Sequence, residues 1–173
     1  GIITNIGPAH QENFSTMEEK VKEKLKLFEH SKIIFYCFDH DIIHKSIVKD
    51  KNLSSKHLIC WSAKNTDCYL YVSKNERKQN NTVLTIVTGN KSHKLSIPFT
   101  DDASIENCLH IITFLLHRVY AVQKLQEALN QLTPVAMRLE QIKGINNTTI
   151  INDSYNSDFN SLRIALDHLA MQK

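Results

Sequence analysis

The apolar positions near the N-terminus form short runs that are separated by stretches of helical spacing. The runs at residues 2–5, 33–38 and 58–61 are rich in β-branched and aromatic side chains, which favour strands. Helices are expected between these runs, at residues 16–29 and 39–48, because apolar residues recur there every three or four positions. This β-α-β-α-β order predicts a parallel sheet with right-handed crossovers.

The pattern changes after residue 62, where polar residues separate shorter apolar runs. Three strands are expected to form an antiparallel extension, and they lie at residues 68–72, 83–88 and 94–98. A highly polar stretch at residues 75–81 is expected to be a mobile loop, and Gly89-Asn90 a hairpin turn. Two helices are then predicted, at residues 105–120 and 122–132.

The last part of the chain is predicted to open a second domain. Pro134 ends the preceding helix, and residues 135–144 are expected to form a linker into a strand at residues 148–152. A final helix is expected at residues 162–172, and a single β-α unit cannot bury a core of its own. The sequence therefore predicts an α/β fold, divided into residues 1–136 and 137–173.

The composition is that of a globular protein, and it excludes several function classes. The chain has 173 residues, 42% of them hydrophobic and 23% charged, and a net charge of +3. This charge is too small to predict binding to nucleic acid or to a membrane surface. No apolar stretch is long enough to span a bilayer. The four cysteines form no CxxC pair, which argues against a zinc site and favours reduced thiols in a cytoplasmic protein.

Two predicted strands end on side chains that suit nucleotide chemistry. One is followed by Asn5-Ile6-Gly7-Pro8-Ala9-His10, and the other by Asp153-Ser154-Tyr155-Asn156. Ligands of α/β proteins collect at the carboxyl ends of strands, so this pattern indicates a nucleotide site shared by two domains. The chain contains no GxxxxGK[ST] loop, and a phosphate loop is expected to lie outside it.

Each candidate residue also has a plainer interpretation. His10 suits a metal or a phosphate, but with nine histidines in the chain the residue type alone favours an ordinary loop histidine. Asp153 and Asn156 suit a ribose, a metal-bound water or a phosphate, or else a turn. Arg138 suits a phosphate, or else an ion pair with Glu140. Among the lysines at positions 20, 22, 24 and 26, at most one is expected to point inward.

Four segments in series resemble motifs of the Mur ligase family. Residues 5–10 resemble its N-x-x-x-A-H strand end, and residues 21–28 its A-K-x-K-x-x-(I/L)-F helix. Residues 134–140 are similar to the hinge into its C-terminal domain, and residues 151–157 to the D-D-S-Y-N-A segment that opens that domain. The amino-acid sequence of the last two segments resembles the Bacteroidetes form, in which an alanine racemase that uses pyridoxal phosphate is fused downstream.

The resemblance implies a fold and a set of residue roles. The fold is the C-terminal half of the P-loop-type central domain, followed by the first β-α unit of the Rossmann-like C-terminal domain. His10 would ligate Mg²⁺, and Lys24 would be the lysine whose carbamylation supplies an anionic metal ligand. Asn5 would lie near the nucleotide and Asn107 would contact adenine. Two further positions of that adenine motif depart from the family, and here they are Ala103 and Ser104.

The resemblance also assigns residues to the mobile side of the site and implies the reaction. Arg138 would meet the ATP phosphates, and Asp153 and Asn156 would close over the nucleotide. The reaction is the ATP- and Mg²⁺-dependent joining of D-Ala-D-Ala to a UDP-MurNAc-tripeptide through an acyl phosphate. The chain alone is expected to lack this activity. The alternatives are a folylpolyglutamate-synthase-like ligase and a non-catalytic module that kept the fold. Oligomeric state stays open.

Overall fold

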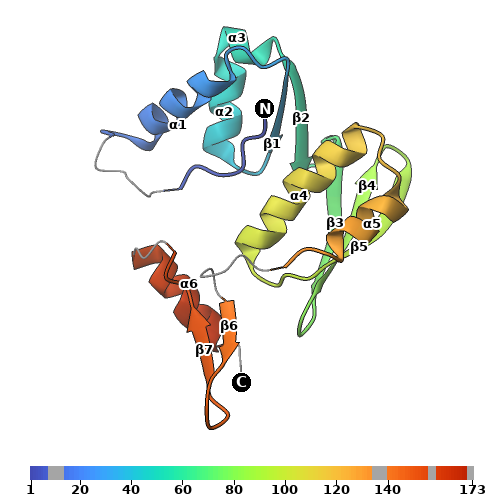
Figure 1. The fold of residues 1–173 in the computed structure, drawn as a ribbon. Coiled ribbons are helices and arrows are strands. Elements are labelled where there is room, and N and C mark those ends of the chain that lie inside the picture. The colour runs from blue at the N-terminus through green and yellow to red at the C-terminus, as the bar shows by residue number, and fades with distance from the viewer. Residues whose placement is uncertain (8–13, 134–139, 156–158, 171–173) are drawn as a thin grey trace. The chain divides into compact units, whose positions relative to one another are not determined.

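The computed structural model describes residues 1–7, 14–133, 140–155 and 159–170 (Figure 1). They belong to two compact units, Gly1–Gln131 and Leu132–Lys173. The domain boundary predicted between residues 136 and 137 lies outside the described residues. Within the described ranges, no helix has the length and apolar character needed to cross a membrane.

The first unit is built on a five-stranded mixed sheet whose strands follow chain order. They are β1 (Ile33–Cys37), β2 (His57–Ser62), β3 (Leu70–Arg77), β4 (Thr82–Thr88) and β5 (Lys91–Ile97). The pairs β1–β2 and β2–β3 are parallel, and the pairs β3–β4 and β4–β5 are antiparallel. The predicted α/β class with an antiparallel extension is thereby confirmed. The run at residues 2–5 forms only one parallel bridge, from Ile2 to Phe35.

The polar stretch at residues 75–81 is only in part the loop that the sequence predicts, because residues 75–77 are strand and residues 78–81 connect the two strands. Asn75, Glu76 and Arg77 continue β3 and pair with the apolar strand β4. A tight turn closes the hairpin, in which the Lys78 amide donates to the Asn81 carbonyl at 2.8 Å. Backbone pairing with a strand that buries one face outweighs the low strand propensity of these polar residues.

The helices of the first unit are bounded by identifiable caps. They are α1 (Met17–Leu25), the 3₁₀ turn η2 (Lys26–Phe28), α2 (Asp41–Lys49), α3 (Lys51–Ser54), α4 (Asp102–His117) and α5 (Val122–Leu129). Thr16 caps α1 and Asp101 caps α4 through side-chain oxygens. The sequence predicts Asp39 or Asp41 as the cap of α2, but the N-cap is His40. Asp39 is held elsewhere, because its carboxylate accepts hydrogen bonds from β2 and the loop after it.

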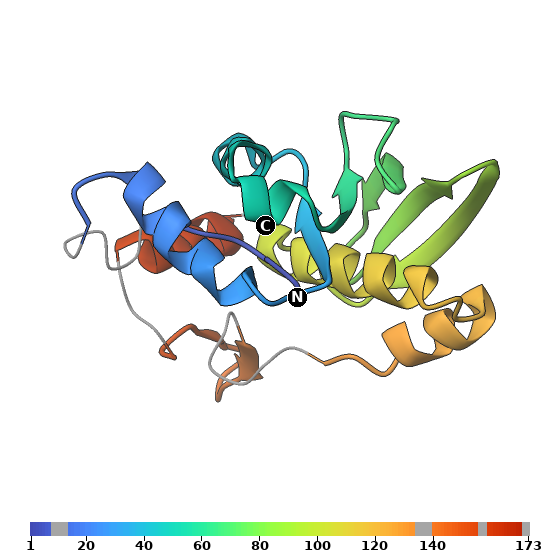
Figure 2. The ribbon, with the colours of Figure 1, turned by 90° about the horizontal axis from the view of Figure 1, so that it is seen from above.

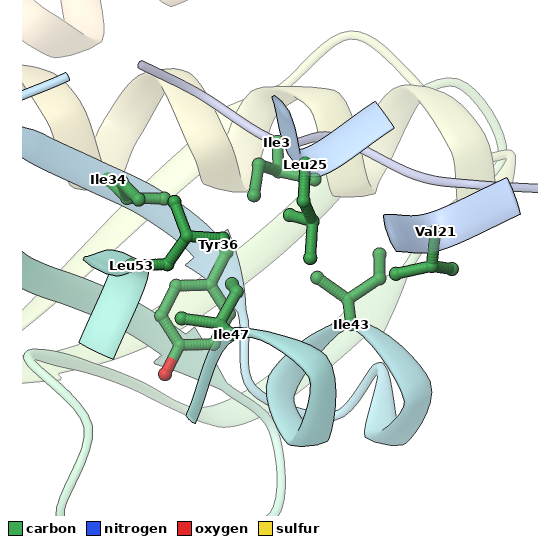
Figure 3. Close-up of a cluster of buried hydrophobic side chains, with 8 residues drawn as sticks. All are labelled: Ile3, Val21, Leu25, Ile34, Tyr36, Ile43, Ile47 and Leu53. Atoms are coloured by element: carbon green, nitrogen blue, oxygen red, sulfur yellow. The ribbon is translucent and has the colours of Figure 1, made fainter. Parts of the chain in front are cut away.

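Helices cover both faces of the parallel strands. On one face, α1, α2 and α3 enclose a cluster of buried side chains with β1, and its residues are Ile3, Val21, Leu25, Ile34, Tyr36, Ile43, Ile47 and Leu53 (Figure 3). On the other face lies α4, where Phe35 meets Phe114 edge-to-face at 5.4 Å. Helix α5 follows α4 at the β5 end of the sheet (Figure 2). This packing fixes the carboxyl ends of β1 and β2.

The second unit is a hairpin followed by a helix. Strands β6 (Glu140–Lys143) and β7 (Thr149–Asn152) are antiparallel, and α6 spans Phe159–Ala170. The linker predicted at residues 135–144 is thus partly strand, and the unit is not a single β-α step. Asn146 and Asn147 both have positive φ, which a tight hairpin turn of type I′ requires at its two central residues and which asparagine tolerates well.

Candidate functional site

The carboxyl edge of the parallel strands meets the first half of α4, and a hydrogen-bonded network joins them. The indole nitrogen of Trp61 in β2 lies 3.2 Å from Nδ1 of His110 in α4. On its other side, His110 Nε2 lies 3.1 Å from the Thr4 carbonyl. One buried imidazole therefore connects β2, α4 and the N-terminal segment that leads into Asn5.

The partners of His110 determine its protonation state. The Trp61 indole is only a donor, so Nδ1 must accept and the ring proton resides on Nε2. Nε2–H then donates to the Thr4 carbonyl. The side chain is 1% exposed, and this burial lowers the pKa of His110, which keeps the ring neutral. All three groups are satisfied only in this tautomer, so His110 holds the N-terminal segment that leads into Asn5.

A second histidine follows β1 at the same edge. His40 Nε2 lies 3.3 Å from a carboxylate oxygen of Glu106, one turn before His110 on α4. The Glu106 hydrogen bond raises the pKa of His40, so the pair gains charge as pH falls toward neutrality and below. His40 Nδ1 is buried and has no hydrogen-bond partner among the described residues. Both side chains are half-buried, which leaves a polar pair in reach of a ligand at this edge.

Asp39, next to His40 in the sequence, has a structural role. Its carboxylate accepts from the Ser62 hydroxyl at 2.5 Å and from the Ala63 amide at 2.8 Å. The Ser62 oxygen in turn accepts from the amides of Lys64 and Asn65. The carboxylate thus joins the loop after β2 to the end of β1.

One lysine of α1 does point inward, and it is Lys20. Its side chain is 2% exposed, and Nζ donates to the Gly7 carbonyl at 2.6 Å. Lys24 lies four residues further along the helix, so it shares this face, but its side chain is exposed. Helix α1 therefore holds the segment just before residue 8 through Lys20, with Lys24 one turn away.

The structure places only some of the predicted site residues. Asn5 and Asn107 are exposed, and they lie on the two segments that His110 joins. Asp153 is half-buried in the second unit, where it lines a hollow of about 420 Å³ with Ser154 and Leu162. The remaining predicted residues lie outside the described ranges, and they are His10, Arg138 and Asn156.

Turn chemistry accounts for one residue beside Asp153. The Asn152 side-chain oxygen accepts from the Ser154 hydroxyl at 2.7 Å and from its amide at 3.3 Å. The Asn152 amide reaches Glu140 across the hairpin at 3.3 Å. Asn152 therefore shapes the end of β7, which sets the direction in which Asp153 leaves the strand.

Sequence reasoning missed several residues of this edge. Asp39 and His40 directly follow a buried strand, so the strand-end rule that selected Asn5 also selects them. Glu106 and His110 are spaced i,i+4 on a helix, which places them on one face. Nothing in the sequence distinguishes Lys20 from its neighbouring lysines. Within the described residues no group of three His, Cys, Asp or Glu side chains could hold a metal ion.

Comparison with known proteins identifies a family to which this architecture corresponds. The sequence profile of the Mur ligase middle domain matches residues 1–115. A UDP-N-acetylmuramoyl-tripeptide–D-alanyl-D-alanine ligase from Haemophilus influenzae is 22% identical over 97% of the chain and 36% of its own length. The chain therefore spans little more than a third of this relative.

Solved structures agree with the profile. MurF from Acinetobacter baumannii superposes with a TM-score of 0.81 at 19% identity, covering 99% of this chain and 37% of that one. MurF from Thermotoga maritima, in complex with ADP, has a TM-score of 0.75 at 16% identity, over 98% and 38%. FPGS from L. casei gives 0.67 at 16% identity, over 97% and 42%. The profile covers well over half of the residues, and the chain belongs to the Mur ligase family.

Proposed function

We propose that the chain is part of an ATP-dependent ligase that joins D-Ala-D-Ala to a UDP-MurNAc-tripeptide. The match of residues 1–115 to the Mur ligase middle domain carries this proposal. The similarity to the H. influenzae ligase and the higher TM-scores of MurF structures favour this substrate pair over that of FPGS. In this reaction ATP phosphorylates the substrate carboxylate, and the dipeptide amine attacks the acyl phosphate.

Within this proposal the carboxyl edge of the first unit is the nucleotide side of the site. Asn5 and Asn107 bind the nucleotide, with Asn107 at adenine. His110 positions both residues, because it bonds the carbonyl before Asn5 and lies one turn after Asn107 on α4. Because His110 bonds both Trp61 and the Thr4 carbonyl within the chain, it holds these two segments in place for the nucleotide.

The second unit supplies the closing side. Arg138 contacts the ATP phosphates as a bidentate donor, and Asp153 and Asn156 close over the nucleotide. The half-buried position of Asp153 beside a hollow is compatible with this role.

His10 and a carbamylated Lys24 are proposed as ligands of Mg²⁺, which neutralises charge on the transferring phosphoryl group. The described residues fit this group only in part. Lys24 lies on the same helix face as Lys20, whose Nζ donates to the Gly7 carbonyl. The Lys24 side chain is exposed, so its amino group is accessible to modification. Among the described residues, no group of three acidic, histidine or cysteine side chains completes such a site.

The test is an assay of the complete open reading frame that contains this chain. We expect ATP cleavage that depends on both UDP-MurNAc-tripeptide and D-Ala-D-Ala. Lys24→Ala is expected to lower kcat by about 10²–10³-fold, the range for losing one group that stabilises transition-state charge. Lys22→Ala is the matched control, since Lys22 is also exposed on α1 and lies on a different helix face.

Each other outcome selects an alternative. Amide formation between glutamate and a folate, without any reaction of D-Ala-D-Ala, would identify a folylpolyglutamate-synthase-like ligase. Absence of ATP turnover with either substrate pair would identify a non-catalytic module. Fusion to an alanine racemase, with pyridoxal phosphate, stays a prediction that the same reading frame decides.

A further inference from the structure

Two cysteines of the first unit have their sulfur atoms in contact. Cys60 lies in β2 and Cys68 lies two residues before β3, and their Sγ atoms are 2.6 Å apart. Both are free thiols. The segment between them is short, and the strands on either side of it are neighbours, because Trp61 of β2 pairs with Leu70 of β3. The fold therefore holds a pair of thiols together that the sequence spacing alone does not mark as a CxxC motif.

The environment separates this pair from the other two cysteines. Burial raises the pKa of Cys37 to about 12 and that of Cys108 to about 11, which keeps both as unreactive thiols. The hydrogen bond from Cys68 lowers the pKa of Cys60 to about 7 and raises that of Cys68. Cys60 is half-buried, while Cys68 is 8% exposed. The more accessible sulfur is thus the one whose deprotonated form the neighbouring thiol can stabilise by a hydrogen bond.

We propose that Cys60 and Cys68 are a redox modification site, in which hydroperoxides oxidise the two thiols to an intramolecular disulfide. The Cys60 thiolate attacks the terminal peroxide oxygen and becomes a sulfenic acid, while the O–O bond breaks and the alcohol or water leaves. The Cys68 thiol then attacks the Cys60 sulfur, and the sulfenic oxygen leaves as water. Two thiols lose two hydrogen atoms in total, and the peroxide is reduced by two electrons.

The disulfide would close a ring that includes part of the carboxyl edge. Ser62 and Ala63 lie within this ring, and both donate to Asp39 at the end of β1. Oxidation therefore constrains the loop after β2, and the same ring contains Trp61, which donates to His110. This inference concerns the chain itself and does not depend on the proposed ligase activity.

The test is oxidation of the 173-residue chain with a small excess of hydrogen peroxide, followed by mass spectrometry. We expect a mass loss of about 2 Da, which dithiothreitol reverses. Trypsin cuts after Lys64, so the pair divides between two peptides, residues 57–64 and 65–74. Without reduction these two peptides are expected to stay joined.

Variants then decide between the pair and its neighbours. Cys60→Ser and Cys68→Ser should each abolish the 2 Da loss. The double variant of Cys37→Ser and Cys108→Ser should keep it. Sulfinic acid at Cys60 with an intact Cys68 thiol, or a disulfide that involves Cys37 or Cys108, would overturn the proposal. The peptide map of the oxidised chain with its original sequence decides the question even where a serine variant folds poorly.

Discussion

The two units use the same kind of apolar pattern with different results. Every buried hydrophobic side chain of the described residues lies in the first unit. In the second unit, Ile150, Leu162 and Leu169 are each more than half exposed, although they lie on a strand and a helix with regular spacing. An amphipathic element gains stability only where another layer covers it. The first unit has helices on both faces of its parallel strands, whereas the second has one hairpin and one helix.

The largest expected effect tests this difference directly. Ile47 is fully buried against α1 and β1, so Ile47→Ala removes three carbon atoms and leaves a cavity. We expect it to cost about 2–5 kcal/mol of unfolding free energy. Leu162→Ala removes as many atoms from an exposed position of α6 and is expected to change it by less than about 0.5 kcal/mol. Urea denaturation followed by the fluorescence of Trp61 measures both.

Trp61 is the one tryptophan of the sequence and belongs to the first unit, so the signal reports that unit. A loss of more than about 1 kcal/mol for Leu162→Ala would break the comparison, because it would show that α6 shares the stability of the first unit.

Local patterns predicted the fold well where burial and propensity agree. The runs that became β1, β2 and β4 are apolar and β-branched, and the structure confirms them as strands. The local pattern did not predict strands whose formation depends on pairing with a neighbouring strand. Asn75 to Arg77 are strand because β4 lies beside them, and β6 forms because a turn with two left-handed asparagines returns the chain. Such pairing joins residues that no local window connects.

The site shows the same division. The strand-end rule found Asn5 and Asp153 because they directly follow runs that predict strands. It did not reveal that Lys20 faces inward, since that depends on where α1 packs. It could not reveal the contact between Trp61 and His110, which are 49 positions apart in the sequence. Long-range hydrogen bonds depend on the packed fold and leave no periodic signal in the sequence.

A second, smaller effect sharpens the comparison, because the first unit also buries polar groups. His110→Leu keeps the volume approximately but leaves the Trp61 indole and the Thr4 carbonyl without their partner. We expect a loss of about 1–3 kcal/mol, the cost of leaving the buried Trp61 indole unsatisfied. Ile111→Ala, at an exposed position on the same helix, is the matched control and should change stability little.

Hydrogen exchange distinguishes positioning from a general loss of stability. The Ile3 amide donates to the Phe35 carbonyl at 2.9 Å, and we expect its exchange in His110→Leu to accelerate more than that of the β4 amides. Equal acceleration in both places would mean that His110 supports the whole core and does not specifically hold the N-terminal segment.

The smallest expected effect is the pH dependence of the pair between His40 and Glu106. Glu106 raises the pKa of His40 in the folded state above the unfolded value of about 6.5. The pair therefore stabilises the fold fully below that unfolded pKa, and this stability is lost as pH rises through the raised folded pKa. Both side chains are partly exposed, so we expect about 1 kcal/mol or less.

Glu106→Gln removes the carboxylate, and urea denaturation is repeated from about pH 5.5 to 9, a range that brackets histidine titration. The stability gap between the original chain and the variant should be widest at the acidic end and close toward the alkaline end. The lowered pKa of His44 destabilises the fold as pH falls in both proteins, so it largely cancels in the difference. Glu106 also raises the pKa of His110, whose Nε2 lies 4.0 Å from the carboxylate, so the loss of Glu106 adds a contribution of the same sign at acidic pH. Glu127→Gln, an exposed glutamate on α5, should show no such gap. A gap that stays constant with pH would mean that Glu106 acts by packing alone, and that His40 gains no charge from its neighbour.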